Sequence, residues 1–570
     1  MKAVNPPPTP SALRRWGPLA GVLAALVAVA VMVLVVDPPG DPDAVAASEQ
    51  AANDESFDLP EGVMPYSVAE AAGTAADIDW GDGCDTEAGV LALPMSPAAE
   101  CFEPFTGEND GATTTGVTAD SIKVVLYLPQ PNDPVLEFVY DQIGLSDTNE
   151  DTIATFEGFA DMYGEYYETY GRKLELVPYV ATGTALDAVA ATTDAETIAR
   201  DLEPFMVIGG PAFGTAFADT LAANEVMCSG CAQSTETQFY LDRAPYVWSI
   251  TTNRDQDSGQ TAEYIGRRLA GGNAEYGGPD VQDDERVFGY IHVATLDAEA
   301  DLRQRFEDQL AEFGVEFADV ASYDDPLSLA GQSREILARM KDRGVTSIVF
   351  RGDPLAPQTL TEQATQQDYF PEWVLSGSIL VDTTIFGRTY DQAQWRHAFG
   401  PSSLAARVSP DVAGSGYLYR WFWDEPPPAA SSAIIAPSLQ FLFGVIQGMG
   451  PTITPEAFQA TIFASPVIEG SVIAPQVSWG DHGFWPETDY SGIDDQVEIW
   501  WDPDATGPDE IGGEGTGMWA YANGGRRYLP GEWPDDAATV FAQDPDPVTL
   551  YTDLPEGVTL PEYEPLPRPG

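Results

Sequence analysis

Short apolar runs alternate with amphipathic stretches over residues 119–378 of the chain. The runs fall at 122–128, 205–208, 287–293, 347–350 and 373–375. Glycine or polar turns separate them, which is the pattern of strands that alternate with helices. This order predicts an α/β fold in which mostly parallel sheets are flanked by helices on both faces. Because such sheets bind ligands beyond the carboxyl ends of their strands, a ligand site is expected there.

The later part of the chain adds helices and then loses the regular alternation. Residues 302–313 and 433–449 have helical spacing of apolar positions. The second stretch is almost wholly apolar after Ala436, but Gln440 and Gln447 interrupt it, so it is expected to be a buried helix rather than a membrane span. Residues 481–535 are rich in Trp, Tyr, Gly and Asp and are expected to form loops and short strands.

Length and charge limit the classes of protein that fit. A chain of 570 residues is longer than one core usually organises, so two or more domains are expected. It has 26 basic and 90 acidic residues, for a formal charge of -64. Nucleic acid is excluded as a partner, because phosphate binding needs clustered Lys and Arg. The acidity is interpreted as a solvated surface that keeps the protein soluble.

The N-terminus has the features of an export or anchoring segment. An uncharged run at 17–36 has the length of a membrane-spanning helix, and Arg14 and Arg15 precede it. The basic flank predicts that residues 1–16 stay in the cytoplasm and that the bulk of the chain is extracellular. A retained transmembrane anchor is favoured. The alternative is a signal peptide cut near 44–46, which would leave a secreted protein.

The four cysteines fit an exported protein. The simplest pairing is Cys84 with Cys101 and Cys228 with Cys231, although crossed pairings stay open. The functional alternatives are a zinc site and a thioredoxin-like redox site. A second CxxC, which a zinc site would need, is missing. The strand-to-helix pattern that surrounds a thioredoxin-like CxxC is missing as well. Residues 37–118, which hold the first pair, are interpreted as an acidic extracellular spacer with one small disulfide-closed loop.

Four segments in order resemble one known family. The segments are 116–124 (GVTADSIKV), 207–211 (VIGGP), 228–233 (CSGCAQ) and 246–252 (YVWSITT). They look like the first strand, the strand and loop that first meet the ligand, and the next loop and strand of branched-chain amino acid binding proteins, which serve ABC importers and have the type 1 periplasmic-binding fold. The resemblance covers roughly residues 116–525. It implies a two-lobed clamp with three crossings between lobes that closes around its ligand.

The resemblance also divides the chain. Lobe one is expected at 119–253 together with 385–480, and lobe two at 258–380 together with 481–525. The last 45 residues or so, 526–570, are interpreted as a Pro-rich tail.

The positions that match the family's ligand cleft lie in five loops. They are Pro211, Ala212, Phe213, Gly230, Ala232, Gln233, Asp297, Asp353, Pro354, Ser376 and Ser378. Amino acid binders offer hydroxyl and free N–H groups to the ligand's carboxylate. Here Ala212, Gly230 and Ala232 offer little beyond backbone, and Phe213 offers an aromatic face. This departure from the family predicts a ligand with an apolar or planar part.

Signatures of catalysis and of cofactor binding are missing from the sequence. It contains no HExxH, no GxSxG and no P-loop, so no enzymatic activity and no cofactor are expected. Residues 502–507 match the first half of a calcium loop, but Gly513 stands where the bidentate glutamate belongs. An acidic turn is therefore expected there rather than a metal site.

These observations predict an extracellular solute-binding protein that captures a small molecule between two lobes. Its expected partners are the solute and a membrane permease of the ABC type. The alternatives are a ligand-sensing receptor with the same clamp and an extracellular hydrolase whose site has no familiar motif.

Overall fold

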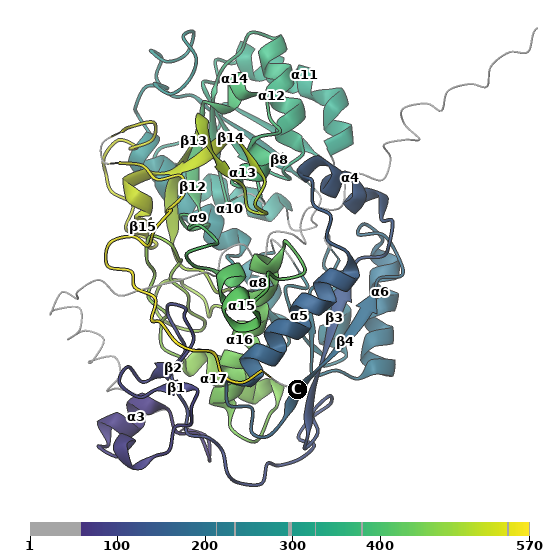
Figure 1. Ribbon diagram of the computed structural model, residues 1–570. Helices are drawn as coiled ribbons and strands as arrows, with labels where there is room; N and C mark the ends of the chain where they lie inside the picture. The colour runs from purple at the N-terminus through teal and green to yellow at the C-terminus, as the bar shows by residue number, and fades with distance from the viewer. Residues whose placement is uncertain are drawn as a thin grey trace, which may run out of the picture.

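The computed structural model describes residues 59–568 except 212–213, 233–234, 295–298, 325, 378–379 and 544–545. Two large sheets, each flanked by helices, organise most of these residues, and β1 and β2 form a separate two-stranded sheet (Figure 1). The expected α/β class is therefore confirmed.

The smaller sheet is wholly parallel, with the strand order β4-β3-β5-β6-β7. Its strands are β3 (Ser121–Leu128), β4 (Lys173–Val180), β5 (Met206–Ile208), β6 (Met227–Ser229) and β7 (Val247–Trp248). The helices of this part of the molecule are α5 (Asn149–Gly164), α6 (Ala188–Thr197), α7 (Ala216–Ala223), α8 (Thr237–Leu241), α15 (Ser415–Trp423), α16 (Ser432–Met449) and α17 (Pro455–Ala464). One hydrophobic core, which we call the first core, joins the sheet to these helices.

The larger sheet has the order β14-β13-β12-β11-β10-β8-β9, and β15 also pairs with β13. Its strands are β8 (Phe288–Val293), β9 (Asp319–Tyr323), β10 (Ser347–Arg351), β11 (Glu372–Leu375), β12 (Ala398–Ser402), β13 (Gln496–Pro508), β14 (Glu514–Tyr521) and β15 (Arg527–Tyr528). Strands β8 to β12 run parallel, whereas β13 and β14 are antiparallel to their neighbours. Its helices are α9 (Arg254–Tyr264), α10 (Glu299–Glu312), α11 (Pro326–Asp342), α12 (Ala356–Gln366), α13 (Thr384–Gly387) and α14 (Gln392–Trp395).

Both faces of the larger sheet are covered, as its continuous apolar strands require. Successive side chains point to opposite faces, so Trp500 packs in one hydrophobic cluster and Trp501 in another. We call the cluster that contains Trp501 the second core.

The chain crosses between the two parts of the molecule three times. It passes from the smaller sheet to the larger sheet after β7, returns to the first core after β12, and passes to the larger sheet again after α17. One expected boundary differs from this path. Lobe one is expected to include residues 385–480, but β12, within that range, pairs with β11 and β13 in the larger sheet. The apolar run alone could not show which sheet this strand joins, because buried strands of either sheet look alike.

The segment before β3 is also more structured than the expected spacer. Residues 59–118 form α3 (Tyr66–Ala71) and the short pair β1 (Cys84–Asp85) and β2 (Val90–Leu91). Trp80, Leu91 and Leu93 are buried in the first core. A few well-placed apolar residues and a disulfide therefore dock this unit despite its polar composition.

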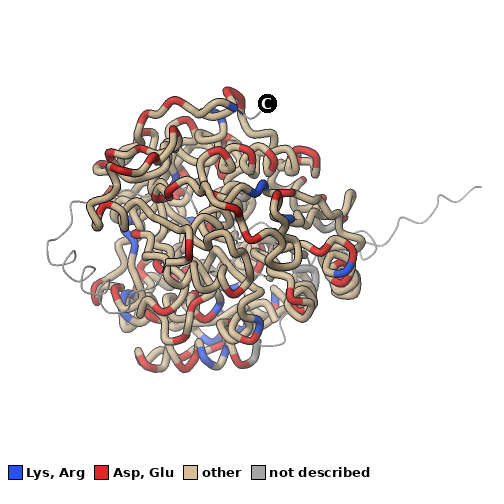
Figure 2. Tube along the Cα trace, turned by 90° about the horizontal axis from the view of Figure 1, so that it is seen from below, with Lys and Arg blue, Asp and Glu red and all other residues tan. Residues whose placement is uncertain are grey.

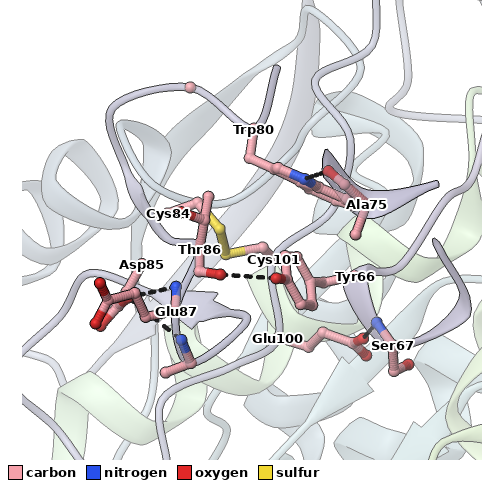
Figure 3. The surroundings of a disulfide bond; sticks show 12 residues. Tyr66, Ser67, Ala75, Trp80, Cys84, Asp85, Thr86, Glu87, Glu100 and Cys101 are labelled. Atoms are coloured by element: carbon pink, nitrogen blue, oxygen red, sulfur yellow. Dashed lines mark hydrogen bonds between the residues drawn. A yellow bond between two sulfur atoms is a disulfide. The ribbon is translucent and has the colours of Figure 1, made fainter. Parts of the chain in front are cut away.

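Both expected disulfides are formed, Cys84–Cys101 and Cys228–Cys231. Figure 3 shows the first of them beside Trp80 and Tyr66, whose rings pack at 4.9 Å between centroids.

The end of the chain returns to the body of the protein instead of leaving it as a tail. Trp533 is buried beside Tyr264, and the Tyr563 hydroxyl donates to Asp85 at 2.8 Å. The Leu566 amide donates to the Tyr166 hydroxyl at 2.9 Å. The proline content thus marks an extended strap that packs on the surface of the fold.

The expected anchor at 17–36 lies outside the described residues. Among the residues that are described, none of the helices combines the length and the apolar character that a membrane span needs.

Candidate functional site

A cavity of about 200 Å³ lies beyond the carboxyl ends of β3, β4, β5 and β6, the edge at which parallel sheets bind ligands. We call it the sheet-edge cavity. Its apolar wall comprises Leu126, Leu128, Leu136, Leu145, Phe156, Ile208, Ile250 and Ile435, and its polar lining includes Asp133, Tyr140, Asp147, Asn149, Thr152, Thr184, Ser229 and Ser438.

Glycines shape the floor of this cavity. Gly209 and Gly230 adopt φ of 80° and 68°, a backbone region that side chains disfavour. A Cβ on Gly210 would lie 2.8 Å from the Cα of Cys231, so the two loops touch through backbone. The Cys228–Cys231 disulfide closes the second of these loops. The floor is therefore held in place by close packing before any ligand arrives.

One wall of the cavity comes from α4 (Pro134–Ile143), which follows β3 in the chain. Leu136 and Val139 of this helix are buried in the second core, together with residues such as Ile291 and Phe350 of the larger sheet. Figure 1 shows α4 above β3, on the side of the molecule that holds the larger sheet. The cavity is thus enclosed between the edge of the smaller sheet and a helix that packs with the larger one.

Two carboxylates of the cavity wall are held by protein donors. Asp133 accepts from the Ala185 amide at 2.9 Å and so links the start of α4 to the loop after β4. Asp147 accepts from the amides of Ala430 and Ser431, both at 2.9 Å, and from the Ser431 hydroxyl at 2.6 Å. These bonds connect both ends of the α4 segment to neighbouring elements and keep negative charge at the cavity.

The electrostatics of the cavity disfavour a negatively charged ligand. Burial, followed by the negative charges of Asp147 and Asp133, raises the pKa of Tyr140 to about 12, so its hydroxyl is protonated at neutral pH. None of the described residues that line the cavity is Lys, Arg or His. The described lining therefore offers no cationic side chain that would compensate a carboxylate ligand for the loss of its hydration shell.

Only some of the residues expected in the cleft lie at this cavity. Pro211 and Gly230 line it. Ala212, Phe213, Gln233, Asp297 and Ser378 lie outside the described residues.

The remaining expected residues are engaged elsewhere. Ala232 is buried in the first core. Asp353 accepts from the Tyr323 hydroxyl at 2.7 Å and from two amides at the start of α12, and Pro354 accepts from Tyr390. The Ser376 hydroxyl donates to the Phe350 carbonyl at 3.1 Å. Asp353, Pro354 and Ser376 lie at the carboxyl ends of β10 and β11 in the larger sheet. None of these three residues, nor Ala232, lines the sheet-edge cavity.

The α4 segment and α16 supply lining residues that sequence reasoning missed, above all Tyr140, Asp147 and Ser438. The signal that could have found the first two is the position of 129–149 directly after β3, since loops at the carboxyl ends of parallel strands build such sites. No local pattern marks Ser438, which reaches the cavity only through tertiary packing.

The half-matched calcium loop lies in β13, where Asp502 accepts from the amides of Asp504 and Ala505. Across the described part of the chain, no three His, Cys, Asp or Glu side chains gather in a way that could hold a metal ion.

No family model and no curated protein matches the chain. Solved structures of ABC transporter solute-binding proteins are similar to it at low identity. One from Rhodopseudomonas palustris BisB5, in complex with 3,4-dihydroxybenzoic acid, is 13% identical with a TM-score of 0.48 and covers 70% of this chain and 97% of its own. Another from R. palustris, in complex with 4-hydroxybenzoate, is 12% identical with a TM-score of 0.49 and covers 73% and 99%. The branched-chain amino acid transporter substrate-binding protein from Streptococcus pneumoniae, in complex with isoleucine, is 13% identical with a TM-score of 0.45 and covers 70% and 100%.

Proposed function

We propose that this protein is an extracellular solute-binding protein that captures one small molecule in the sheet-edge cavity and releases it unchanged. The observation that supports this proposal most directly is the composition of the cavity. It lies beyond the strand ends of a parallel sheet, it is enclosed by a helix from the other side, and its lining is mainly apolar with a few convergent polar groups. Such a lining is suited to binding a small molecule.

The solute is proposed to be neutral or positively charged, with an apolar body. Asp133, Asp147 and the protonated Tyr140 hydroxyl are the groups near which a polar or cationic part of the solute would lie. The apolar wall around Phe156 and Ile435 would contact the rest of it. Transfer to an ABC-type permease is the proposed use of the captured solute.

Calorimetric titration of a solute panel into the purified protein tests the proposal. The panel contains neutral, cationic and anionic members of similar size. One neutral or cationic solute is expected to bind with one-to-one stoichiometry and to raise the melting temperature, because a ligand of the native state stabilises it. Binding of anions alone would contradict the proposed charge preference.

The Tyr140→Phe variant locates the binding site. Loss of one hydrogen bond to the solute is expected to weaken binding about tenfold, while the ring keeps its packing. Tyr417→Phe, on α15 and away from the cavity, is the matched control and is expected to leave the affinity unchanged. Equal affinity of both variants and the parent protein would remove Tyr140 from the site.

A further inference from the structure

A second and larger cavity, of about 640 Å³, shares no lining residue with the sheet-edge cavity. Its walls come from residues 90–102 of the disulfide-closed unit, from α16 and α17, from the segment that follows α17, and from the C-terminal strap. We call it the α16 cavity. Its volume falls in the range of about 300–1,000 Å³ that small-molecule sites occupy.

A smaller cavity of about 80 Å³ adjoins the α16 cavity and extends it along the helix. The two cavities share lining residues, among them Met95, Gln440 and Ile468. On α16, the smaller cavity begins at Ala436 and the larger one reaches Gly448, and a helix rises about 18 Å over that stretch. The combined space is therefore elongated rather than compact.

The walls of the α16 cavity are mainly apolar. Phe441 and Trp479 pack at 5.0 Å between ring centroids and form an aromatic wall. The other apolar side chains of the lining include Val90, Met95, Phe102, Val445, Ile462 and Val467. Apolar walls offer water few hydrogen-bond partners, so such a cavity favours an apolar occupant.

Hydroxyl groups in this lining are directed to acceptors of the protein itself. The Ser465 hydroxyl donates to the Thr461 carbonyl at 2.9 Å, and the Ser478 hydroxyl donates to the Asp494 carboxylate at 2.7 Å. The Thr461 hydroxyl lies 3.5 Å from the Gly448 carbonyl, to which it donates. Because these groups already have partners, they require no polar group from an occupant.

The charged side chains of the described lining are both acidic. They are Glu100 and Glu469, and none of the described lining residues is Lys, Arg or His. Figure 3 shows the Glu100 carboxylate at the Ser67 amide, from which it accepts a hydrogen bond. Glu469 is exposed and follows Ile468, which is 41% exposed, so these two residues lie where the cavity meets solvent. An anionic group on the occupant is therefore disfavoured.

Two features of the walls keep this space open. The Cys84–Cys101 disulfide closes the loop that supplies lining residues 90–100 (Figure 3). On the helix, Gly444 stands in the middle of α16, where glycine is less favourable than alanine. A Cβ added to Gly444 would meet no atom within 4 Å, so this glycine leaves free space beside the helix.

We propose that the α16 cavity is a second binding site, for a molecule with one flexible aliphatic chain and an uncharged head group. The chain lies along α16 and contacts the aromatic wall, and the head group lies near Ile468, where the cavity meets solvent. Removal of the chain's apolar surface from water supplies the binding free energy. This site is independent of the solute site proposed above.

Straight-chain alcohols are suitable probes, because they differ in apolar surface but not in charge. Calorimetric titration of the full chain is expected to show saturable binding of decan-1-ol. Each methylene added between hexan-1-ol and decan-1-ol is expected to tighten binding about fourfold. Decanoate, an anion of the same chain length, is expected to bind at least tenfold more weakly than decan-1-ol. No saturable decan-1-ol binding, affinities that do not change with chain length, or equal affinities for decanoate and decan-1-ol would overturn the proposal.

The Gly444→Leu variant assigns this binding to the α16 cavity. The new side chain occupies the free space beside the helix and is expected to abolish decan-1-ol binding. Gly331→Leu is the matched control, because Gly331 is an exposed glycine of α11 that also has free space at its Cβ. Unchanged decan-1-ol affinity in a folded Gly444→Leu variant would place the binding elsewhere and overturn the proposal.

A second variant removes apolar surface from the cavity without filling it. Ile468 lines both adjoining cavities, and its exposure makes a polar replacement tolerable for the fold. Ile468→Ser is expected to weaken decan-1-ol binding about fivefold. Val189→Ser, at a 77% exposed position of α6 that lines neither cavity, is the matched control and is expected to leave the affinity unchanged. Equal affinities of these two variants would also overturn the proposal.

Discussion

Arg286 and Glu372 form an ion pair that solvent does not reach. The Arg286 guanidinium donates to the carboxylate at 2.8 and 3.0 Å, and the Ser347 hydroxyl adds a bond at 2.5 Å. The two side chains are only 4% and 0% exposed. Removal of one member would leave a buried charge without its partner, which is far more costly than the loss of a surface pair.

The Arg286→Met variant is therefore expected to lose about 3–5 kcal/mol of unfolding free energy. Arg303→Met, which breaks the pair with Glu307 at side-chain exposures of 40% and 30%, is expected to lose about 0.5 kcal/mol or less. Urea denaturation of both variants measures the two losses. Similar losses would show that burial does not set the strength of these pairs.

At the scale of elements, α4 determines how the sheet-edge cavity is closed. Val139 is fully buried in the second core, and Val125 of β3 is equally buried in the first. Both Val→Ala changes remove the same two methyl groups from a core, so they are expected to cost similar stability. Only Val139→Ala loosens the helix that encloses the cavity.

Calorimetry with the identified solute is expected to show several-fold weaker binding to Val139→Ala and little change for Val125→Ala. Equal affinities would mean that the packing of α4 on the second core does not support the solute site.

The two disulfides are expected to have different effects on stability and binding. Cys84 and Cys101 are 17 residues apart, and a crosslink over such a loop contributes about 3 kcal/mol. Cys228 and Cys231 are separated by 3 residues, so their bond constrains little chain, but it closes a loop that packs on Gly210 of the cavity floor.

A double Cys→Ser variant of the first pair is expected to lower the melting temperature strongly and to keep the solute affinity. The corresponding variant of the second pair is expected to weaken solute binding with a smaller change in melting temperature. The opposite assignment of the two effects would contradict this account.

The apolar runs predicted β3, β5, β8, β10 and β11, but they did not predict strands such as β4 and the long β13, or which sheet β12 joins. Continuous apolar runs mark β3, β8 and β10 because both faces of these strands are buried. The docking of α4 could not be predicted, since an amphipathic helix shows that it has a buried face but not which core receives it. The cavity residue Ser438 could not be predicted for the same reason, because it belongs to a helix that is distant in sequence from the strands it faces.

At the scale of the whole molecule, acidic groups predominate both outside and inside. Figure 2 shows acidic positions spread along the chain and far fewer basic ones. Burial raises the pKa of Asp257 to about 6 and those of Asp382 and Asp494 to about 7, against ordinary values near 3.8. These carboxyls bind protons more tightly in the folded than in the unfolded chain.

Their contribution to stability is therefore fully present below about pH 4 and is lost as the pH rises through about 6 to 7. The melting temperature is expected to fall between about pH 4 and pH 7 and to change little from this cause above pH 7. Asp382→Asn, which keeps the site neutral beside the Ser402 hydroxyl, is expected to reduce this fall. Thermal denaturation of the parent protein and of Asp382→Asn across this pH range measures both changes. A melting temperature that rises with pH would contradict the assignment of buried neutral carboxyls.

The central claim is that the molecule binds a solute in the sheet-edge cavity without changing it chemically. Mass spectrometry of the solute recovered from the saturated protein tests this most directly, with the affinity of Tyr140→Phe measured on the same solute. The account predicts one solute per chain, recovered with its mass unchanged, and about tenfold weaker binding by the variant. Recovery of a product of different mass, with turnover beyond one equivalent, would contradict it.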